Sequence, residues 1–320
     1  MNVLITGGSG FIGTRLIDDL LKDDNIVKIF DKVPSAKYPE LVVLGDVRDE
    51  KALTEACRGM DIIYNLAAEH ADDVTPLSLY SDVNVGGAKN VVKAAAANGI
   101  KKIVFTSSVA IYGLNRGEPD ESFEPRPFNE YGRTKSEAEK IFLQWAEDDP
   151  TNALTIVRPS VVFGEKNRGN VYNLIKQIAS RKFLMVGDGR NRKSMSYVGN
   201  ISAFLASLVN AKESIEIYNF AGKPDLSSKE IVNIVQDELG IQSKIPSAPY
   251  WLGLMGGYVF DMLAKITGKK FPVSSIRVKK FTAETTVATK RLEESGFKEP
   301  YTLEEGLQRM IKYEFLENET

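Results

Sequence analysis

The feature that most constrains the fold of this chain is a glycine-rich turn close to the N-terminus. An apolar segment, Val3–Thr6, leads directly into Gly7, Gly10 and Gly13, and an amphipathic pattern over residues 11–21 follows. Glycines at this spacing allow a tight turn, a close approach of the backbone to a pyrophosphate, and close packing of the helix on the strand. The first helical turn then presents free N–H groups and the positive end of its dipole to the phosphates. The pattern predicts a strand–turn–helix unit that binds a dinucleotide.

The second predicted strand, Ile26–Asp31, ends in an acidic residue 18 positions after Gly13. A carboxylate at this point suits a ribose 2′-hydroxyl and repels a 2′-phosphate, so Asp31 favours NAD over NADP. The next residue, Lys32, carries the opposite charge and keeps NADP as the alternative.

Strand and helix patterns alternate through the first half of the chain, which predicts an α/β fold with a doubly wound parallel sheet of the Rossmann type. Past Pro159 the alternation fades, and short helical patterns over residues 224–268 are interrupted by Pro246, Pro249 and Gly253. We expect an NAD-binding domain over residues 1–163, which also receives segments from about 190–220, and a smaller, discontinuous α/β substrate domain over 164–320. The predicted strands are Val3–Thr6, Ile26–Asp31, Val42–Leu44, Ile62–Leu66, Lys102–Ser107 and Leu154–Arg158. The predicted helices are Phe11–Leu21, Glu50–Cys57, Leu79–Asn98 and Glu130–Ala146.

Composition and charge argue against several classes of protein. The net charge of −2 over 320 residues and the pI of about 5.8 do not favour a nucleic-acid-binding surface. A single cysteine, Cys57, excludes an internal disulfide, and a single histidine, His70, with no cysteine nearby leaves no zinc site. The chain enters its first predicted strand without the pattern of a signal peptide. We therefore expect a cytoplasmic protein without a metal.

A tyrosine and a lysine four positions apart, Tyr131 and Lys135, are the strongest catalytic candidates. On a helix this spacing places phenol and ammonium on one face, and so close a cation is expected to lower the phenol pKa towards the range of a working general acid or base. Ser108, at the end of a predicted strand, can be brought alongside by the loop that follows it. A second match, Tyr172 and Lys176, lies where the alternating pattern ends, and we interpret it as structural, with substrate contact as the alternative.

These motifs together resemble the extended short-chain dehydrogenases/reductases of the NAD-dependent sugar epimerase/dehydratase family, over nearly the whole chain. The matching segments are Thr6–Gly13, Asp31, Gly45–Val47, Asn65–Ala68, Asn84, Ser107–Gly113, Tyr131–Lys135, Arg158–Pro159 and Gly187–Gly189. The resemblance implies that NAD is the cofactor, that Lys135 also holds nicotinamide-ribose hydroxyls and that Ser108 hydrogen-bonds the reacting oxygen. It further implies that Asn84 supports the active site.

The same resemblance implies a cofactor-binding set drawn from the glycine turn and the strand ends. Within it, Asp46 and Val47 would meet the adenine. The full set is Gly7, Gly10, Phe11, Ile12, Gly13, Asp31, Lys32, Asp46, Val47, Leu66, Ala67, Ala68, Asn84, Ser107, Tyr131, Lys135 and Pro159.

The residues that follow Ser108 narrow the reaction. Val109 and Ala110 stand where dehydratases of the family have an Asp-Glu pair and related decarboxylases a glutamate, and neither side chain can move a proton. Cys57 and His70 lie outside the positions of the Cys/His pair that epimerase-reductases use. A 4-epimerisation through a transient 4-keto sugar remains, because it needs one acid/base and one hydride acceptor. The alternatives are an NAD(P)-dependent dehydrogenase/reductase and a non-catalytic dinucleotide sensor.

Three further segments bear on the carrier of the sugar. Residues 68–74, 169–177 and 266–270 resemble the bacterial N-acetylglucosaminyl-diphospho-undecaprenol 4-epimerases. This resemblance implies an interconversion of GlcNAc and GalNAc on undecaprenyl diphosphate for lipopolysaccharide O-antigen, with a UDP-glucose/UDP-GlcNAc 4-epimerase as the alternative. Lys193 can neutralise a diphosphate, although without the bidentate geometry of an arginine. The substrate candidates are Ser108, Tyr131, His70, Asn170, Lys193 and Arg277.

Residues 250–270 form an unusually apolar segment that ends in Lys269 and Lys270. The apolar part is shorter than the roughly 20 residues of a membrane span, and Asp261 interrupts it. It predicts either helices packed within the small domain or a surface that docks peripherally on the cytoplasmic face of the inner membrane, with the lysines on anionic headgroups. The family resemblance also implies a homodimer formed through residues 79–98 and 130–146.

Overall fold

A seven-stranded parallel sheet organises the larger part of the molecule. The computed structural model describes residues 1–71, 74–211, 215–268 and 274–317. The strand order is β3-β2-β1-β4-β5-β6-β10, and every neighbouring pair is parallel, as in a doubly wound dinucleotide-binding sheet. The predicted fold class is therefore confirmed. The strands are β1 (Asn2–Thr6), β2 (Ile26–Asp31), β3 (Val42–Leu44), β4 (Ile62–Asn65), β5 (Lys102–Thr106), β6 (Ala153–Pro159) and β10 (Ile215–Phe220).

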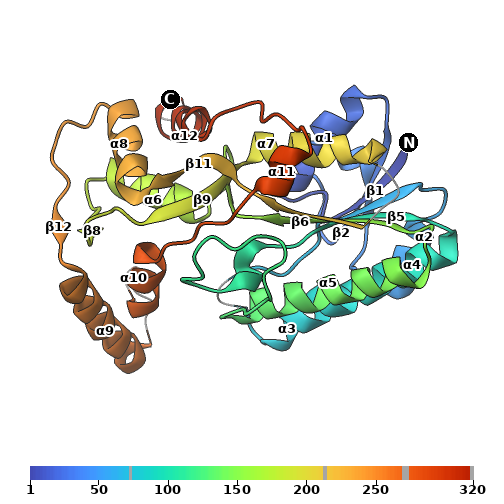
Figure 1. The fold of residues 1–320 in the computed structure, drawn as a ribbon, viewed down its shortest axis with the longest axis horizontal. Helices are drawn as coiled ribbons and strands as arrows, with labels where there is room; N and C mark the ends of the chain where they lie inside the picture. Colours follow the sequence, from blue (N-terminus) through green and yellow to red (C-terminus); the bar gives the residue numbers. More distant parts are fainter. Residues whose placement is uncertain (72–73, 212–214, 269–273, 318–320) are drawn as a thin grey trace.

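Helices cover both faces of this sheet, which explains why its central strands are almost continuously apolar (Figure 1). One face is covered by α1 (Phe11–Lys22) and α7 (Val198–Ser207), which pack against each other. The other face is covered by α2 (Glu50–Ala56), α4 (Gly87–Asn98) and α5 (Glu130–Asp148). Each face has its own buried apolar cluster. The first includes Leu16, Leu20, Tyr64 and Phe204, and the second Leu53, Val91, Phe105, Phe142 and Trp145.

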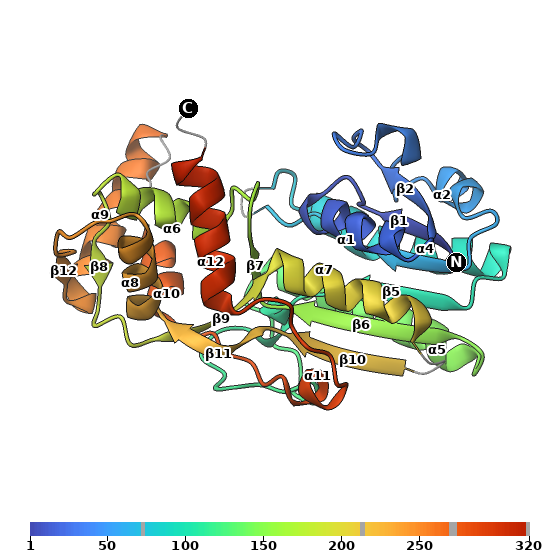
Figure 2. The ribbon, with the colours of Figure 1, turned by 90° about the horizontal axis from the view of Figure 1, so that it is seen from above.

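The rest of the chain forms a smaller lobe beside the sheet (Figure 2). It contains a three-stranded sheet of β7 (Val161–Phe163), β9 (Arg192–Tyr197) and β11 (Gly222–Ser227), and a two-stranded sheet of β8 (Met185–Val186) and β12 (Ser247–Ala248). Its helices are α6 (Asn170–Ala179), α8 (Ser228–Glu238), α9 (Tyr250–Thr267), α10 (Ser275–Thr282) and α12 (Leu303–Ile311), while α11 (Lys290–Glu294) lies against β10. A third apolar cluster, which includes Phe163, Ile175, Tyr197, Val235 and Leu307, holds this lobe together. The predicted domain boundaries stay a prediction.

The structure corrects one predicted helix. The expected continuous helix Leu79–Asn98 is divided into a short helix α3 (Ser78–Tyr80), a π-helical turn over Ser81–Gly86, and α4. The wider turn inserts an extra residue into the helical repeat, and such turns often occur at functional sites. A helical sequence pattern does not reveal it, because the apolar spacing on either side is unchanged.

A second correction concerns Gly253, where the sequence predicted an interruption. Helix α9 continues through this residue. A Cβ atom at Gly253 would lie 2.5 Å from a side-chain carbon of Val186, so this glycine permits close packing of α9 on β8 and does not end a helix. In the described part of the chain, no helix has both the length and the apolar character needed to cross a bilayer.

Candidate active site

The glycine turn lies between β1 and α1. Neighbouring backbone atoms leave no room for a side chain at Gly7 or Gly13. Gly7 has φ +72°, and a Cβ on it would lie 2.7 Å from the Ala67 amide nitrogen. A Cβ on Gly13 would lie 2.6 Å from Gly8 Cα, so the first turn of α1 packs directly on the preceding loop. Gly10 is the N-cap of α1, and no side chain caps this end among the described residues. The N–H groups at the start of α1, including those of Phe11 and Ile12, are thus arranged as a phosphate-binding site requires.

Asp31 ends β2 beside this turn. Its carboxylate accepts hydrogen bonds from the Ser9 and Val33 amides at 3.0 and 3.2 Å, which ties the turn to the end of β2. The ammonium of Lys32 is exposed and lies 4.0 Å from the carboxylate of Glu69. The acidic group that would receive a ribose 2′-hydroxyl is therefore fixed in place, and an acidic neighbour partly balances the adjacent lysine.

Asp46 and Val47 follow β3. The Asp46 carboxylate forms an ion pair with Arg48 at 2.6 Å, and hydrogen bonds from this arginine hold the pKa of Asp46 below its ordinary value. Val47 is buried against Gly87, and its carbonyl accepts a hydrogen bond from Asn90 at 2.9 Å. The adenine contact proposed for this pair remains a prediction.

The remaining cofactor candidates lie at the ends of the neighbouring strands. Leu66, Ala67 and Ala68 follow β4, Ser107 follows β5, and Pro159 ends β6. Because these strands are parallel, their carboxyl ends share one edge of the sheet with the glycine turn. The hydroxyl of Ser107 is buried and has no hydrogen-bond partner among the described residues. An unpartnered buried hydroxyl, an uncapped helix and a cradle that a Cβ would fill all fit a bound dinucleotide.

Tyr131 lies in the first turn of α5, half-buried, with Asn129 as N-cap accepting a hydrogen bond from the Gly132 amide at 2.9 Å. The structure brings Ser108 alongside it, as the sequence predicted, and the serine side chain hydrogen-bonds the phenol. The predicted fall in the pKa of Tyr131 was wrong for this structure. Burial raises this pKa, the Ser108 hydrogen bond lowers it by less, and Tyr80 raises it further.

Burial of the phenol is the largest cause of this rise, and Lys135 is buried as well. Its ammonium is buried, donates to the Thr106 carbonyl at 2.7 Å, and lies 4.8 Å from the centre of the Phe105 ring. Burial lowers the pKa of Lys135 to about 7, although the nearby Glu139 acts in the opposite direction. A lysine that is only partly protonated near neutral pH offers little positive charge to a phenol. The pair is thus two desolvated groups, each with its pKa displaced towards the neutral form.

Asn84 connects the π-helical turn to this site. Its side chain exchanges hydrogen bonds with the backbone of Glu69, at 2.8 and 3.1 Å, and donates to the Thr134 hydroxyl at 2.9 Å. Thr134 lies on α5 between Tyr131 and Lys135. These contacts agree with the predicted supporting role of Asn84, because its side chain joins the segment after β4 to the helix that carries the tyrosine.

Sequence reasoning missed a buried ion pair behind the tyrosine–lysine helix. Arg158 on β6 makes two hydrogen bonds to the carboxylate of Glu139 on α5, at 2.9 and 2.8 Å, and a third to the Tyr112 hydroxyl at 2.7 Å. Both charged side chains are about 95% buried. Glu139 follows Lys135 by four positions, so the helical spacing placed an acid on the lysine's face and could have indicated it.

Of the six predicted substrate residues, Ser108 and Tyr131 are in contact, and the other four lie on separate segments of the chain. His70 is exposed after β4, Asn170 is exposed at the start of α6, and Arg277 is exposed on α10. Lys193 on β9 donates to the carbonyls of Lys280 and Ala283 at 3.2 and 3.0 Å, which uses two of its three donors at the end of α10. Burial lowers its pKa to about 8.

The second Tyr-x-x-x-Lys match has a structural role. Tyr172 stacks on Phe315 with 5.3 Å between ring centres, and the guanidinium of Arg168 lies 4.3 Å from the centre of the Tyr172 ring. These contacts agree with the interpretation of Tyr172 as a packing residue, and substrate contact stays the alternative prediction.

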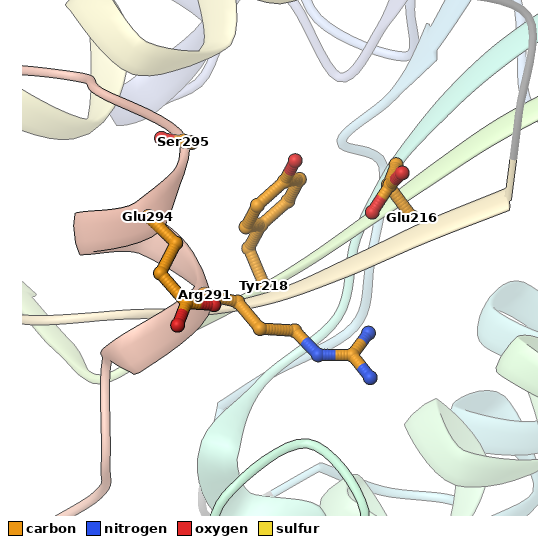
Figure 3. A pocket seen from close by; sticks show the side chains of 5 residues that line it. All are labelled: Glu216, Tyr218, Arg291, Glu294 and Ser295. Carbon is orange, nitrogen blue, oxygen red and sulfur yellow. The ribbon is translucent and has the colours of Figure 1, made fainter.

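A separate hollow of about 290 Å³ lies against the edge strand β10 and α11 (Figure 3). It is lined by Glu216, Tyr218, Arg291, Glu294 and Ser295. None of these residues belongs to the motifs above, and the hollow is unrelated to the site at the strand ends.

The doubly wound sheet, the glycine turn and the Ser108–Tyr131–Lys135 set define the class of extended short-chain dehydrogenases/reductases. A model of the NAD dependent epimerase/dehydratase family matches residues 3–221, and the chain belongs to this family. It is 54% identical over 319 residues to the N-acetyl-alpha-D-glucosaminyl-diphospho-ditrans,octacis-undecaprenol 4-epimerase of Escherichia coli O157:H7, a match that covers 98% of this chain and 96% of that protein. It is 29% identical over 326 residues to the UDP-glucose 4-epimerase of Vibrio cholerae, covering 96% and 94% of the two chains.

Solved structures show the same fold. The UDP-glucose 4-epimerase of Thermus thermophilus in complex with NAD superposes with a TM-score of 0.75 at 22% identity, covering 98% of both chains. Because the identity is low, this likeness supports the architecture alone. NAD as the cofactor follows from family membership and agrees with the Asp31 carboxylate at the end of β2.

Proposed function

We propose that this protein is an NAD-dependent epimerase that interconverts GlcNAc and GalNAc at C4 while the sugar is attached to undecaprenyl diphosphate, for surface polysaccharide synthesis. The observation that carries the proposal is the 54% identity to the Escherichia coli enzyme over 98% of this chain. The identity to the Vibrio cholerae enzyme named for a UDP-sugar is 29%. A soluble UDP-glucose or UDP-GlcNAc is therefore the second candidate substrate.

Tyr131 is the acid/base of the proposed reaction. Its phenolate form, which burial disfavours in the NAD-free site, would remove the proton from the sugar O4, and its phenol form would return the proton after the ketone has turned its other face. Ser108 hydrogen-bonds the same oxygen and holds it beside the phenol. The glycine turn, Asp31 and Lys135 would hold NAD⁺, which would supply reversible hydride transfer at C4.

The residues beside Ser108 support an epimerisation over an elimination. Val109 and Ala110 lie in a 3₁₀ turn that begins at Ser108, and neither can donate or accept a proton. A second acid/base is therefore missing at this position. A reaction that only oxidises and re-reduces one carbon does not need one.

The deciding experiment supplies GlcNAc as the polyprenyl-diphosphate sugar and, separately, as the UDP-sugar, and measures GalNAc in each. We expect conversion of the lipid-linked sugar with no net NADH. Conversion of the UDP-sugar alone would exclude the lipid carrier, and accumulation of NADH would indicate a dehydrogenase.

We further propose that the protein acts as a cytoplasmic homodimer that contacts the membrane peripherally. Helices α4 and α5 lie side by side on one face of the sheet, and a shallow apolar hollow between them is lined by Val92, Ile141 and Trp145, among others. This pair of helices would form the dimer contact. Sedimentation of the wild type and of an Ile141→Lys variant tests it: a dimer that the substitution does not weaken would place the contact elsewhere.

A further inference from the structure

Helix α9 exposes its large apolar side chains. It lies at the extremity of the smaller lobe, beyond β8 and next to α10 (Figures 1 and 2). Gly257 is the one buried residue among its 18. Nine of the 23 large apolar side chains that are exposed in the described part of the chain belong to this helix. They are Tyr250, Trp251, Leu252, Met255, Tyr258, Val259, Met262, Leu263 and Ile266.

The amphipathic order of α9 is reversed with respect to a helix that packs on a protein core. Six of these side chains recur every three or four residues and so form one stripe on one face. We call them the outer stripe: Trp251, Met255, Tyr258, Val259, Met262 and Ile266. Exposure reaches 65% at Trp251 and 73% at Ile266.

Two glycines and an acid contribute to the face of α9 that is turned towards the protein. Gly253 packs on Val186, and a Cβ on Gly257 would lie 2.7 Å from Ser275 Cα. The carboxylate of Asp261 accepts a hydrogen bond from the Ser275 amide at 3.1 Å, at the start of α10. The glycines bring α9 close to the lobe, and the acid that interrupts the apolar segment points towards the protein. The outer stripe is therefore not a core surface.

Basic groups lie beside the outer stripe. Lys265 is exposed in the last turn of α9, and Lys279 is exposed on α10. The ammonium of Lys279 lies 5.5 Å from the centre of the Tyr258 ring. Helix α10 contains no acidic residue, and the single acid of α9 faces inward, so the edge of the stripe is positive. Lys269 and Lys270, which the sequence placed on headgroups, lie outside the described residues.

We infer that α9 lies in the plane of an anionic bilayer, with the outer stripe below the headgroups and Lys265 and Lys279 at the phosphates. Exposed aromatic residues, an apolar stripe and a basic edge are the features of an interfacial helix. The inference rests on the proposed function, since a polyprenyl-diphosphate sugar is presented at such a surface. Of the two interpretations of the apolar segment, the inference adopts docking on the membrane.

The test measures binding of the full-length protein to sedimented vesicles. One set contains phosphatidylcholine alone, and the other contains about a quarter phosphatidylglycerol as the anionic lipid. We expect binding to the anionic set, weakened when salt is raised from about 0.1 M to about 1 M because the Debye length falls from ~10 to ~3 Å. A wild type that stays in the supernatant with anionic vesicles would refute the inference.

Matched variants assign the binding to the outer stripe. Met255→Gln/Met262→Gln replaces two exposed residues by a good helix former, and we expect roughly tenfold or greater loss of vesicle binding. Ile26→Gln/Ile215→Gln removes the same number of exposed apolar residues at strand starts and should bind as the wild type does. Equal binding by both double variants would exclude the stripe.

Fluorescence locates the helix directly. The chain has two tryptophans, of which Trp145 is buried and Trp251 is on the stripe. Anionic vesicles should shift the emission to shorter wavelength and reduce acrylamide quenching in the wild type, and should have no such effect on Trp251→Phe. A change that persists in Trp251→Phe would contradict insertion of α9.

Two measurements separate this inference from the proposed function. If the Met255→Gln/Met262→Gln variant loses vesicle binding but still converts a detergent-solubilised lipid-linked sugar, both stand. If the wild type converts only UDP-GlcNAc yet binds anionic vesicles, the carrier assignment fails and the docking surface stands. If the same substitutions convert a dimer to a monomer in sedimentation and the wild type ignores vesicles, a second copy covers the stripe and the inference is wrong.

Discussion

Replacing Lys135 by methionine should stabilise the fold near neutral pH while abolishing catalysis. Burial lowers the pKa of this lysine from an ordinary 10.5 to about 7. At about 1.4 kcal/mol per pH unit, holding the charged form inside costs the folded state roughly 5 kcal/mol at or below pH 7. Methionine removes this cost but leaves the Thr106 carbonyl without its donor, which costs about 2 kcal/mol. We therefore expect the variant to be about 3 kcal/mol more stable at pH 6.5.

The stability difference between the wild type and Lys135→Met should change sign with pH. Between pH 7 and 10.5 the unfolded chain binds more protons at this lysine than the folded chain, so the stability of the wild type rises with pH across that window. The Lys135→Met variant lacks the rise, and its advantage should shrink and reverse towards pH 10.

Urea unfolding of the NAD-free proteins at pH 6.5, 8 and 9.5 measures the effect, all at roughly equal ionic strength. Lys51→Met on α2, which removes an exposed lysine, is the control and should track the wild type at each pH. Parallel profiles for the wild type and Lys135→Met would refute the argument, because they would mean that the buried ammonium carries no penalty.

Three further predictions concern the site and its support. Tyr131→Phe should lower kcat by roughly 100- to 10,000-fold with NAD binding unchanged, measured by GalNAc formation and by cofactor titration; near-normal turnover would exclude the acid/base role. Gly13→Ala should weaken NAD binding by on the order of tenfold or more, because its Cβ would overlap the preceding turn, whereas Gly256→Ala, with open space around the added carbon, should not; calorimetric titration compares them. Glu139→Gln should destabilise the fold by about 3–5 kcal/mol, because it leaves a buried guanidinium without its counter-charge. The half-buried Glu137, whose side chain is far more accessible, should lose less than about 1 kcal/mol on Glu137→Gln; similar losses in denaturant would show that burial is irrelevant.

Local signals predicted the parts of the site that local structure determines. The first strand, the glycine turn and the α5 helix with Tyr131 agree with the sequence, because apolar periodicity and caps act within a few residues. The protonation states of Tyr131 and Lys135 could not be predicted from the sequence. Whether Lys135 is charged depends on Thr106 and Phe105, which another strand contributes, and burial by distant elements leaves no trace in the spacing of the two residues.

Contacts between distant elements also explain why the sequence did not predict other features of the site. The π-helical turn that carries Asn84 interrupts a pattern that reads as one helix, and the Arg158–Glu139 pair joins residues 19 positions apart on different elements. For α9 the sequence left packing and exposure open, since an apolar helix looks alike in sequence whether its stripe meets a core or a surface. The substrate residues remain predictions for a related reason: they belong to a lobe whose loops follow no repeating pattern.

The position of β10 has a consequence for synthesis of the chain. The strand that completes the sheet beside β6 is made about 60 residues later, which takes roughly 3–12 s at a translation rate of about 5–20 residues per second. During that interval the newly made sheet ends in an open backbone edge, a template on which another nascent chain can pair. While residues between β6 and β10 are being made, aggregation thus competes with closure of the sheet. Slower translation of this intervening segment would lengthen that interval.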